Sequence, residues 1–229
     1  MKNEQRELFL LDKSKLQLYF IAGTTNIGER TLPDVLEAAL KGGITAFQLR
    51  EKGEGALVGA ALKELAEQCQ ALCKTYNVPF LVNDDVELAL EIGADGVHIG
   101  QQDGDVTEVR TKIGADKILG VSAHTVNDAF VASDAGADYV GIGPLYETTT
   151  KKDAASVVGP ELVSEVVKEL PGLPVVGIGG ISERKAGTVI RAGASGVAVI
   201  SAITGKEDIE EAARTLKGRL LLALTGVEM

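Results

Sequence analysis

Short apolar runs alternate with longer amphipathic stretches along most of the chain. The stretches, such as "LPDVLEAALKGG", "ALKELAEQCQALCKTY" and "GPELVSEVVKEL", place apolar residues at helical spacing. The runs are rich in Val, Ile and Leu and have the length of buried strands. We expect eight such strands: "LQLYFIAG", "ITAFQLR", "PFLVND", "GVHIG", "ILGVSA", "YVGIGP", "PVVGIGG" and "GVAVISAI".

A short motif recurs where a predicted helix gives way to a predicted strand. It appears as "GADGVHIG" from Gly93, "GADYVGIG" from Gly136 and "GASGVAVI" from Gly193, with a looser relative, "GGITAFQLR", from Gly42. Each copy starts with glycine, which is favoured where a helix ends in a left-handed residue. The copies are 43 and then 57 residues apart, which excludes a solenoid of constant period. The motif therefore indicates a repeated junction.

Eight strands alternating with helices in 229 residues predict an α/β protein, a single (β/α)8 TIM barrel. We expect one domain over residues 1–229, with residues 1–15 forming a short extra N-terminal helix over the base of the barrel. A doubly wound open sheet is the alternative. That fold usually has fewer strands and a G-x-G-x-x-G turn after the first, which "IAGTTN" does not match.

Charge and cysteine content narrow the classes of partner and compartment. A net charge of -10 argues against nucleic acid or an anionic membrane as a partner. The N-terminal "MKNEQRELFLLDKSK" is too charged for a signal peptide, and no apolar run is as long as a membrane span. We expect a soluble cytoplasmic protein. Cys69 and Cys73, on one predicted helix, are expected to be reduced structural thiols.

Polar residues gather at the end of the second predicted strand. In this fold the chemistry lies at the C-terminal ends of the strands. Strand alternation places Gln48, Arg50 and Lys52 on one face and Leu49 and Glu51 on the other. An amide and two cations on one face would form an anion clamp. The alternative is an ordinary charged strand end at the surface.

Carboxylates follow the third and fourth predicted strands. "NDD" ends the third strand at Asp85, and Asp103 lies shortly after the fourth. Because these strands are neighbours, their carboxylates could share one Mg²⁺, which typically takes one or two carboxylates plus substrate phosphate. The alternative for "NDD" is a helix N-cap. Both hold if Asp85 caps the helix while Asp84 faces the mouth of the barrel.

Other strand ends carry groups that suit phosphate. "GPLYETTTKKDA", residues 143–154, is either a solvated loop or a phosphate site with hydroxyls, backbone amides and Lys151. Ser122, at the end of the fifth strand, could donate to a phosphate or a polar ring. Small residues at the ends of the seventh and eighth strands let backbone amides approach a phosphate. Two separated cationic places suggest two phosphorylated small molecules, or one with two anionic ends. His98 and His124 are expected to pack or orient neighbours, because no nucleophilic triad is evident.

Several motifs together resemble the thiamine-phosphate synthase family. They are "QLREK", "NDD", "GVHIGQQD", "GVSAHT", "YVGIGPLYETTTKKDA", "VVGIGGI" and "GVAVISAI", in the family's order, from about Gln48 to Ile203. The resemblance implies the (β/α)8 barrel. It also implies Mg²⁺-dependent coupling of hydroxymethylpyrimidine diphosphate to hydroxyethylthiazole phosphate, which yields thiamine monophosphate and pyrophosphate.

The resemblance also implies roles for particular residues. Lys151, Arg50, Lys52 and Ser122 would be catalytic, and Asp84 and Asp103 would bind Mg²⁺. The pyrimidine diphosphate would be held by Gln48, Arg50, Lys52, Asn83 and Ser122. The thiazole phosphate would be held by Thr148, Thr149, Thr150, Gly180, Ile200 and Ser201, with Lys151 bridging to the departing pyrophosphate. One departure is visible: this chain has Glu147 where the family usually has proline.

Other functions remain open at this stage. A thiazole tautomerase on the same barrel would lack the metal aspartates and the diphosphate clamp. A phosphosugar isomerase or aldolase would need a carboxylate base or a Schiff-base lysine within the barrel. A non-catalytic thiamine-phosphate binding protein would bind without turnover. The sequence leaves the oligomeric state open, with a homodimer as one option.

Overall fold

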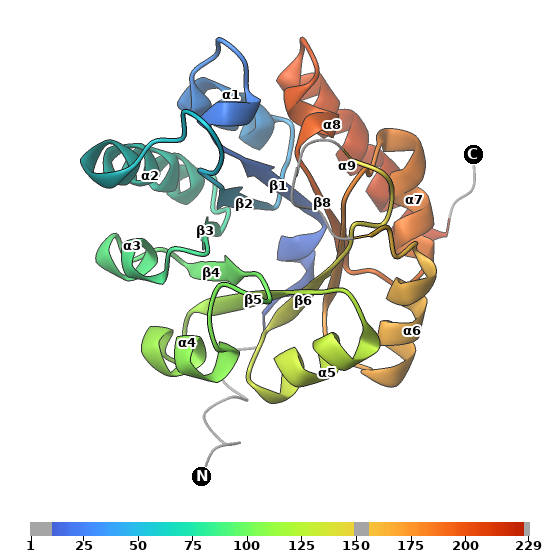
Figure 1. Ribbon diagram of the computed structural model, residues 1–229. Coiled ribbons are helices and arrows are strands. Elements are labelled where there is room, and N and C mark those ends of the chain that lie inside the picture. The colour runs from blue at the N-terminus through green and yellow to red at the C-terminus, as the bar shows by residue number, and fades with distance from the viewer. Residues whose placement is uncertain (1–10, 149–155, 227–229) are drawn as a thin grey trace.

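Eight parallel strands close into a barrel in chain order, from β1 round to β8 beside β1, in a computed structural model that describes residues 11–148 and 156–226 (Figure 1). The strands are β1 (Leu18–Ala22), β2 (Ala46–Leu49), β3 (Phe80–Asn83), β4 (Gly96–Ile99), β5 (Ile118–Ala123), β6 (Tyr139–Ile142), β7 (Val175–Ile178) and β8 (Gly196–Val199). The predicted (β/α)8 fold is confirmed.

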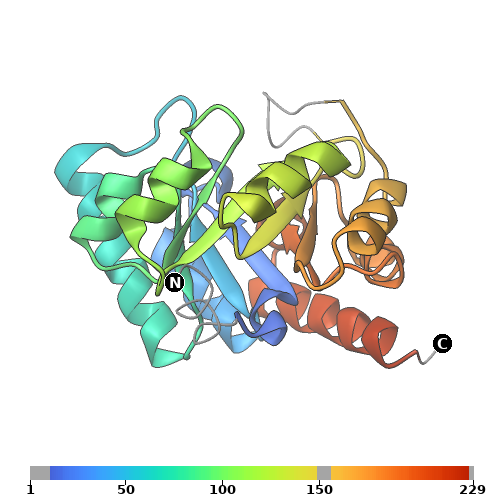
Figure 2. The ribbon, with the colours of Figure 1, turned by 90° about the horizontal axis from the view of Figure 1, so that it is seen from below.

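Helices cover the outside of the barrel (Figures 1 and 2). They are α1 (Leu32–Lys41), α2 (Gly59–Thr75), α3 (Val86–Glu91), α4 (Val106–Ile113), α5 (Val126–Asp134), α6 (Glu161–Glu169), α7 (Glu183–Arg191), α8 (Ser201–Thr204) and α9 (Ile209–Thr225). Two 3-10 helices, η1 (Lys13–Leu16) and η2 (Thr24–Asn26), flank β1. Of residues 1–15, which we expect to form an extra helix, residues 1–10 lie outside the described part, so that expectation stays a prediction; η1 begins at Lys13.

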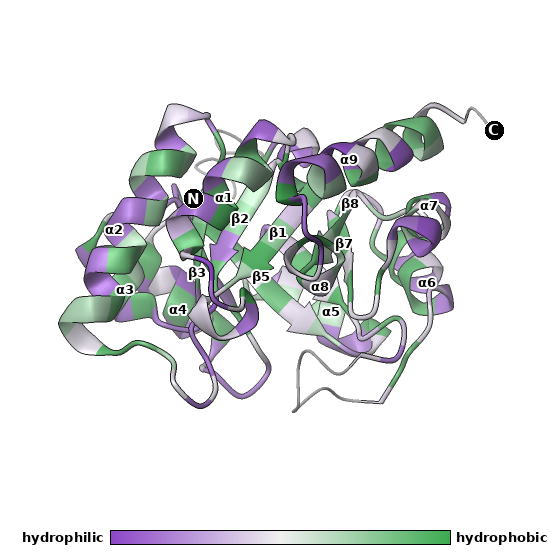
Figure 3. Cartoon of the chain, turned by 90° about the horizontal axis from the view of Figure 1, so that it is seen from above, coloured by the Kyte–Doolittle hydropathy of each residue, from purple (hydrophilic) through white to green (hydrophobic). Residues whose placement is uncertain are grey.

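Apolar side chains form two layers. The larger layer lies between the strands and the helices, and the smaller one fills the barrel interior with residues such as Tyr19, Leu81 and Tyr139. Hydrophobic residues mark the strands and the inward faces of the helices, while hydrophilic ones dominate the outside (Figure 3). Within the described ranges, no helix is both long and apolar enough to cross a membrane.

The recurrent glycine motif ends a helix in each of its four copies. The glycines at the C-termini of α1, α3, α5 and α7 have positive φ: Gly43 (94°), Gly93 (67°), Gly136 (105°) and Gly193 (103°). In the copy at "GGIT" the left-handed residue is Gly43, while Gly42 is right-handed, which corrects the expected position. The next residue donates its N–H five residues back, as in the bond from Ala94 N to the Ala89 carbonyl, so each helix closes with a Schellman-type turn.

The residue before each even-numbered strand ties that strand to the preceding odd one. Thr45, Asp95 and Asp138 each donate their N–H to the carbonyl of the first residue of the earlier strand, or of the one beside it. Their side chains accept the N–H of that same residue: Thr45 Oγ1 from Leu18, Asp95 Oδ2 from Phe80 and Asp138 Oδ2 from Leu119. Before β8, Ser195 N donates to the Val175 carbonyl. The repeat unit is therefore two strands long, and its insertions explain the irregular spacing.

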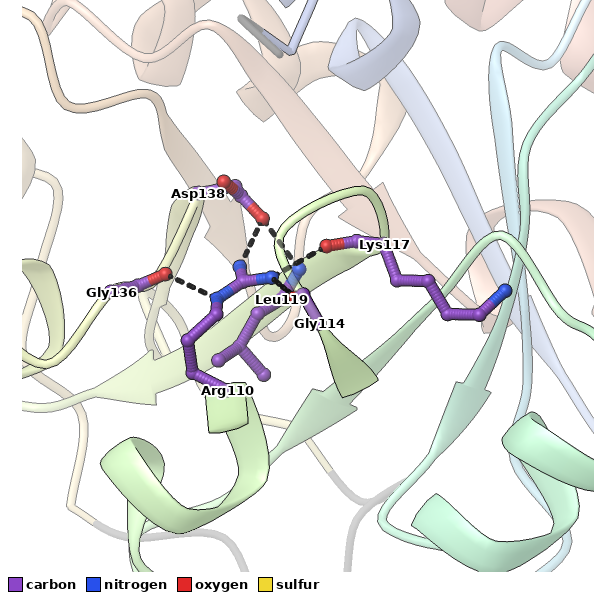
Figure 4. A network of polar contacts seen from close by, with 6 residues as sticks. All are labelled: Arg110, Gly114, Lys117, Leu119, Gly136 and Asp138. Atoms are coloured by element: carbon purple, nitrogen blue, oxygen red, sulfur yellow. Dashed lines mark hydrogen bonds and ion pairs between the residues drawn. The ribbon is translucent and has the colours of Figure 1, made fainter. Parts of the chain in front are cut away.

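Arg110 of α4 reinforces one of these ties at the base of the barrel (Figure 4). Its guanidinium donates to the carbonyls of Gly136, Gly114 and Lys117 at 2.8–3.0 Å. It also pairs with Asp138 at 2.5 Å. Both side chains are largely buried. A buried ion pair needs further hydrogen bonds to offset the loss of solvation, and the three carbonyls provide them.

Candidate active site

The predicted site residues that the structure describes gather at the C-terminal ends of the strands. One pocket opens from the barrel interior, and we call it the barrel pocket. It is lined by eight of the predicted residues: Gln48, Arg50, Asn83, Ser122, Thr148, Gly180, Ile200 and Ser201. Thr149, Thr150 and Lys151 lie outside the described residues, so their predicted roles stay predictions.

A cluster of opposite charges stands beside this pocket. Lys52 contacts the Asp84 carboxylate, and its Nζ lies 3.8 Å from Asp103 Oδ1. Asn83 donates to Asp84 Oδ2 at 2.6 Å, and Gly100 N donates to Asp103 Oδ2 at 3.0 Å. The expected grouping of the two aspartates from neighbouring strands is thus what the structure has, with Lys52 between them.

Asp84 is held in an unusual environment. Its φ is 60°, in the left-handed region that non-glycine residues rarely adopt. Burial raises the pKa of its carboxyl; Lys52 acts in the lowering direction, and the nearby carboxylate of Asp103 raises the pKa further. Asp85 instead caps α3, accepting the Leu88 N–H at 2.9 Å. The two adjacent aspartates therefore divide between capping and the mouth of the barrel, as expected.

Two carboxylates of this kind fit a hard divalent cation. Magnesium is commonly bound through one or two carboxylates, with water and substrate phosphate completing its coordination. Asp84 and Asp103 offer that donor set, and their mutual repulsion is relieved here by the Lys52 ammonium. No cluster of three or more metal-ligating His, Cys, Asp or Glu side chains occurs in residues 11–148 and 156–226.

A chain of hydrogen-bonded side chains crosses the barrel interior beneath the pocket. Gln48 Nε2 donates to Tyr19 Oη at 2.8 Å, and Tyr19 Oη lies 2.9 Å from Tyr139 Oη. Tyr139 Oη lies 2.9 Å from His98 Nδ1, and His98 Nε2 lies 3.0 Å from Ser122 Oγ. We call these five residues the interior chain. His98 therefore orients neighbours, as the sequence indicates.

The sequence reasoning missed Tyr19 and Tyr139. Both are fully buried in apolar strands, where a tyrosine ordinarily counts as core. A signal was present: Gln48, His98 and Ser122 all occupy strand positions, and buried polar groups require partners. Phenol hydroxyls were the groups available to satisfy them.

The loops after β6 and β7 are built against each other. Leu145 N donates to the Ile178 carbonyl at 2.8 Å, and Tyr146 N donates to the Gly179 carbonyl at 3.0 Å. Gly180 has a φ of 63°, and a Cβ there would strike the carbonyls of Tyr146 and Glu147. Glycine at this position therefore allows the β6 loop to approach the β7 loop closely.

His124 supports the start of the β6 loop. Its Nδ1 donates to the Gly143 carbonyl at 2.5 Å, because a carbonyl oxygen can only accept. Its own N–H is bound by Asp128 Oδ2 at 2.8 Å. This places His124 in the orienting role that the sequence suggests.

A larger cleft of about 1680 Å³ adjoins the barrel pocket between the β6 loop and the helices α7 and α9. The two cavities share five lining residues: Pro144, Thr148, Gly180, Ile181 and Ser201. Glu147 lines this outer cleft but does not line the barrel pocket. The described part of the predicted phosphate loop, residues 143–148, thus lies at the boundary between the two spaces.

Polar mouths of this kind, with cations and close-packed glycine loops at the strand ends, are typical of (β/α)8-barrel enzymes that act on phosphorylated small molecules. The profile of the family described as thiamine monophosphate synthase matches residues 18–203. The chain belongs to the thiamine-phosphate synthase family, and it is a transferase of thiamine biosynthesis.

Individual relatives agree with this assignment. The thiamine-phosphate synthase of Geobacillus kaustophilus is 53% identical over 93% of this chain and 96% of its own length. That of Bacillus mycoides is 54% identical over 88% of this chain and 91% of its own. The solved structure of thiamine phosphate pyrophosphorylase from Pyrococcus furiosus superposes with a TM-score of 0.84 at 33% identity, covering 93% of this chain and 98% of that one.

Proposed function

We propose that the chain joins 4-amino-2-methyl-5-(diphosphooxymethyl)pyrimidine to 4-methyl-5-(2-phosphooxyethyl)thiazole in a Mg²⁺-dependent dissociative substitution. The products are thiamine monophosphate and pyrophosphate. The observation that carries the proposal is the position of Asn83, which lines both the barrel pocket and the neighbouring cavity that contains Lys52 and Asp84. In the proposal, the pyrimidine substrate would lie across that junction, with its flat ring on one side and its diphosphate tail on the other.

In this arrangement the pyrimidine ring occupies the barrel pocket and its diphosphate extends toward the charged cluster. Gln48 and Ser122 are within the pocket, Arg50 lines its rim, and Lys52 stands in the adjoining cavity. The residues of the predicted anion clamp would therefore have two roles. The Gln48 amide would contact the pyrimidine ring, and Arg50 and Lys52 would contact the diphosphate.

Asp84 and Asp103 would hold Mg²⁺. The bound ion would add positive charge to the diphosphate oxygens and so stabilise the charge that develops on the leaving group. Lys52, which pairs with both carboxylates here, would then turn its ammonium toward the diphosphate.

The thiazole phosphate would bind at the boundary between the barrel pocket and the outer cleft. Thr148, Gly180 and Ser201 line both spaces. Ser201 begins α8 and Ile200 is its N-cap, and the first N–H groups of a helix lack intrahelical acceptors. Thr149, Thr150 and Lys151 would complete this site.

The reaction itself asks for charge stabilisation and positioning. The bond from the pyrimidine methylene carbon to the diphosphate oxygen breaks, and its electron pair leaves with pyrophosphate. The aminopyrimidine ring stabilises the cation, and the lone pair of the thiazole nitrogen then forms the new C–N bond. No proton has to be removed, so no general base is required. Arg50, Lys52 and Lys151 would each contribute about 3–4 kcal/mol to stabilising the leaving group.

A direct coupling assay tests the proposal. Both phosphorylated substrates are mixed with the protein, with and without Mg²⁺, and products are followed by phosphorus NMR. Thiamine phosphate and pyrophosphate in equal amounts, only with Mg²⁺, are expected. Pyrophosphate without thiamine phosphate would contradict binding of the second substrate and point to Glu147. Binding of thiamine phosphate with no turnover of either substrate would favour a tautomerase-like relative or a binding protein.

A further inference from the structure

We propose that Tyr19, Tyr139 and His98 form a one-way hydrogen-bond relay that holds the Ser122 hydroxyl as a donor toward the barrel pocket. These three residues would be positioning residues: they act on substrate through Ser122. The inference rests on the proposed function for one point only, the contact of Ser122 with the pyrimidine diphosphate.

The direction of the relay follows from the group at its far end. Gln48 meets Tyr19 through Nε2, and an amide nitrogen donates but does not accept. Tyr139 Oη lies 2.9 Å from Tyr19 Oη, a contact in which either phenol can be the donor, and the relay assigns the hydrogen of the Tyr19 hydroxyl to it. Tyr139 has then used its oxygen as an acceptor from Tyr19, and its own hydrogen points to His98 Nδ1 at 2.9 Å.

The tautomer of His98 sets the direction of the next hydrogen bond. A neutral imidazole that accepts at Nδ1 carries its hydrogen at Nε2. His98 Nε2 lies 3.0 Å from Ser122 Oγ, so the ring donates to the serine oxygen. The hydroxyl hydrogen of Ser122 is then directed away from the histidine, and Ser122 lines the barrel pocket.

Burial keeps both phenols in the form that the relay needs. Tyr19 and Tyr139 are about 1% and 0% exposed. Burial raises the pKa of each hydroxyl, so each keeps one hydrogen to donate at neutral pH. The two rings pack edge-on with 5.9 Å between their centroids.

Two strand glycines make room for the relay. A Cβ at Gly120 would strike the phenol end of Tyr139 and the Nδ1 of His98. A Cβ at Gly141 would lie 3.1 Å from His98 Cε1. Glycine inside a strand weakens it and often marks a close approach by another group. Here the approaching groups are the central members of the relay.

The relay would matter to catalysis because it fixes the direction in which the Ser122 hydroxyl donates its hydrogen. An isolated hydroxyl can donate or accept and must reorient when a ligand arrives. A hydroxyl whose oxygen is already an acceptor from His98 presents its hydrogen to an anionic substrate with little reorganisation. Donors oriented before the reaction are the effective ones in charge stabilisation.

The first test determines which ring nitrogen of His98 carries the hydrogen, and it needs no enzymatic activity. The chain has two histidines, so ¹⁵N labelling of histidine gives two ring systems to assign. Two-bond ¹⁵N–¹H correlations at pH 8 should show hydrogen on Nε2 of His98 and on Nδ1 of His124, which donates to the Gly143 carbonyl. His124→Asn assigns the signals. Hydrogen on Nδ1 of His98 would overturn the relay direction.

The second test is a double-mutant cycle on turnover. Ser122→Ala should lower kcat by roughly 10²-fold and Tyr139→Phe by roughly 10-fold. In the double variant Tyr139→Phe should cost nothing further, because its effect passes through the serine. Tyr76→Phe, which removes a phenol hydroxyl at the C-terminal end of α2, is the matched control and should leave kcat unchanged.

The outcomes separate the relay from the proposed function. No coupling by the wild-type protein contradicts the function, while the NMR result still decides the relay. Full activity in Ser122→Ala contradicts the assigned role of that serine. Losses that multiply in the double variant contradict action through Ser122. If Tyr139→Phe does not fold by circular dichroism, Tyr19→Phe replaces it in the same cycle.

Discussion

Asp84 combines a strained backbone with a carboxylate that lies beside a second carboxylate, two features that lower stability. Its backbone is in a left-handed conformation that costs roughly 1–3 kcal/mol for most residues, and its largely buried carboxylate lies beside a second carboxylate. Nothing in the packing of α3 needs that carboxylate, because Asp85 provides the cap. Backbone strain of this kind is expected at residues that bind a ligand.

Asp84→Asn should therefore separate stability from activity. Asparagine tolerates the left-handed region and removes the charge that burial disfavours, so the melting temperature in EDTA should rise. Turnover should fall by roughly 10²-fold or more, because the proposed magnesium ligand and its charge are lost. Thermal denaturation and the coupling assay measure the two effects.

Asp85→Asn is the matched control. The substitution is the same and one residue away, and asparagine caps a helix about as well as aspartate. Both the melting temperature and turnover should stay close to wild type. Equal losses of activity in the two variants would show that the assay responds to the segment rather than to the carboxylate of Asp84.

The two cysteines should be inert in the native protein. Cys69 and Cys73 are free and fully buried, and burial raises the pKa of the Cys69 thiol to about 12. Thiolate, the reactive form, is then scarce at ordinary pH. Titration with a disulfide reagent at pH 8 should detect no thiol before denaturation and two afterwards. Rapid reaction of the native protein would contradict this burial.

Residue roles were predictable where a side chain meets solvent or a helix terminus, and less so inside the barrel. The division of labour between Asp84 and Asp85 followed from their place between a strand and a helix. Tyr19 and Tyr139 could not be identified in the same way, because their role depends on a hydrogen bond between them. One lies in β1 and the other in β6, 120 positions further along the chain. No local pattern encodes that pairing.

At the scale of elements, the β6 and β7 loops behave as one unit. They share two backbone hydrogen bonds, and Gly180 meets the carbonyls of the β6 loop at its closest approach. Displacing one loop should move the other. The proposed thiazole-phosphate site depends on both.

Gly180→Ala should therefore weaken the second substrate selectively. The new methyl group would push against Tyr146 and Glu147, and we expect KM for the thiazole phosphate to rise about tenfold. KM for the pyrimidine diphosphate should change little. Initial rates with each substrate varied in turn measure this.

Gly28→Ala is a control that separates the steric clash of a new Cβ from the conformational cost of a left-handed alanine. Gly28 has a similar φ of 69° but nothing lies within 4 Å of a Cβ there. Both variants should lose about 1 kcal/mol or more of stability from the left-handed conformation. Kinetic change should appear in Gly180→Ala alone; the same change in both would assign it to backbone strain.

The predicted element boundaries failed where small residues continue an apolar run. "GVAVISAI" has the composition of one strand, yet β8 ends at Val199 and α8 begins at Ser201. Helix and strand are hard to distinguish in so short an apolar segment. The junction motif was predicted more accurately, because a left-handed glycine has few alternatives.

Across the whole molecule, stability and chemistry are assigned to opposite ends of the barrel. The polar network of Arg110 and Asp138 closes the base, while the candidate site occupies the other end. Changes at the base should therefore alter folding and leave the chemistry of folded molecules intact.

Arg110→Ala tests that separation. Removing one member of a buried, hydrogen-bonded pair should lower the free energy of unfolding by about 3 kcal/mol, since Asp138 keeps an uncompensated charge. Specific activity per folded molecule should be unchanged at 20 °C. Urea denaturation gives the first quantity and active-site-normalised rates give the second.

Arg214→Ala provides the comparison. Arg214 forms ion pairs with Glu210 and Glu211 on the exposed face of α9, where such pairs contribute about 1 kcal/mol or less. A similar loss in both variants would mean that charge removal, rather than the network at the base, sets the effect.

The ties made by Thr45, Asp95, Asp138 and Ser195 have a consequence for how the chain acquires its structure. Each tie joins an odd-numbered strand to the next even one and closes a short loop, so these contacts cost less chain entropy than closure of β8 on β1. The barrel can therefore assemble from four two-strand modules. In native-state hydrogen exchange, amides should open by pairs, with β1 and β2 sharing one opening free energy, and exchange that ignores these pairs would contradict the idea. Ring closure then becomes the late step of folding, and the candidate site, which draws on all four modules, exists only once that step is complete.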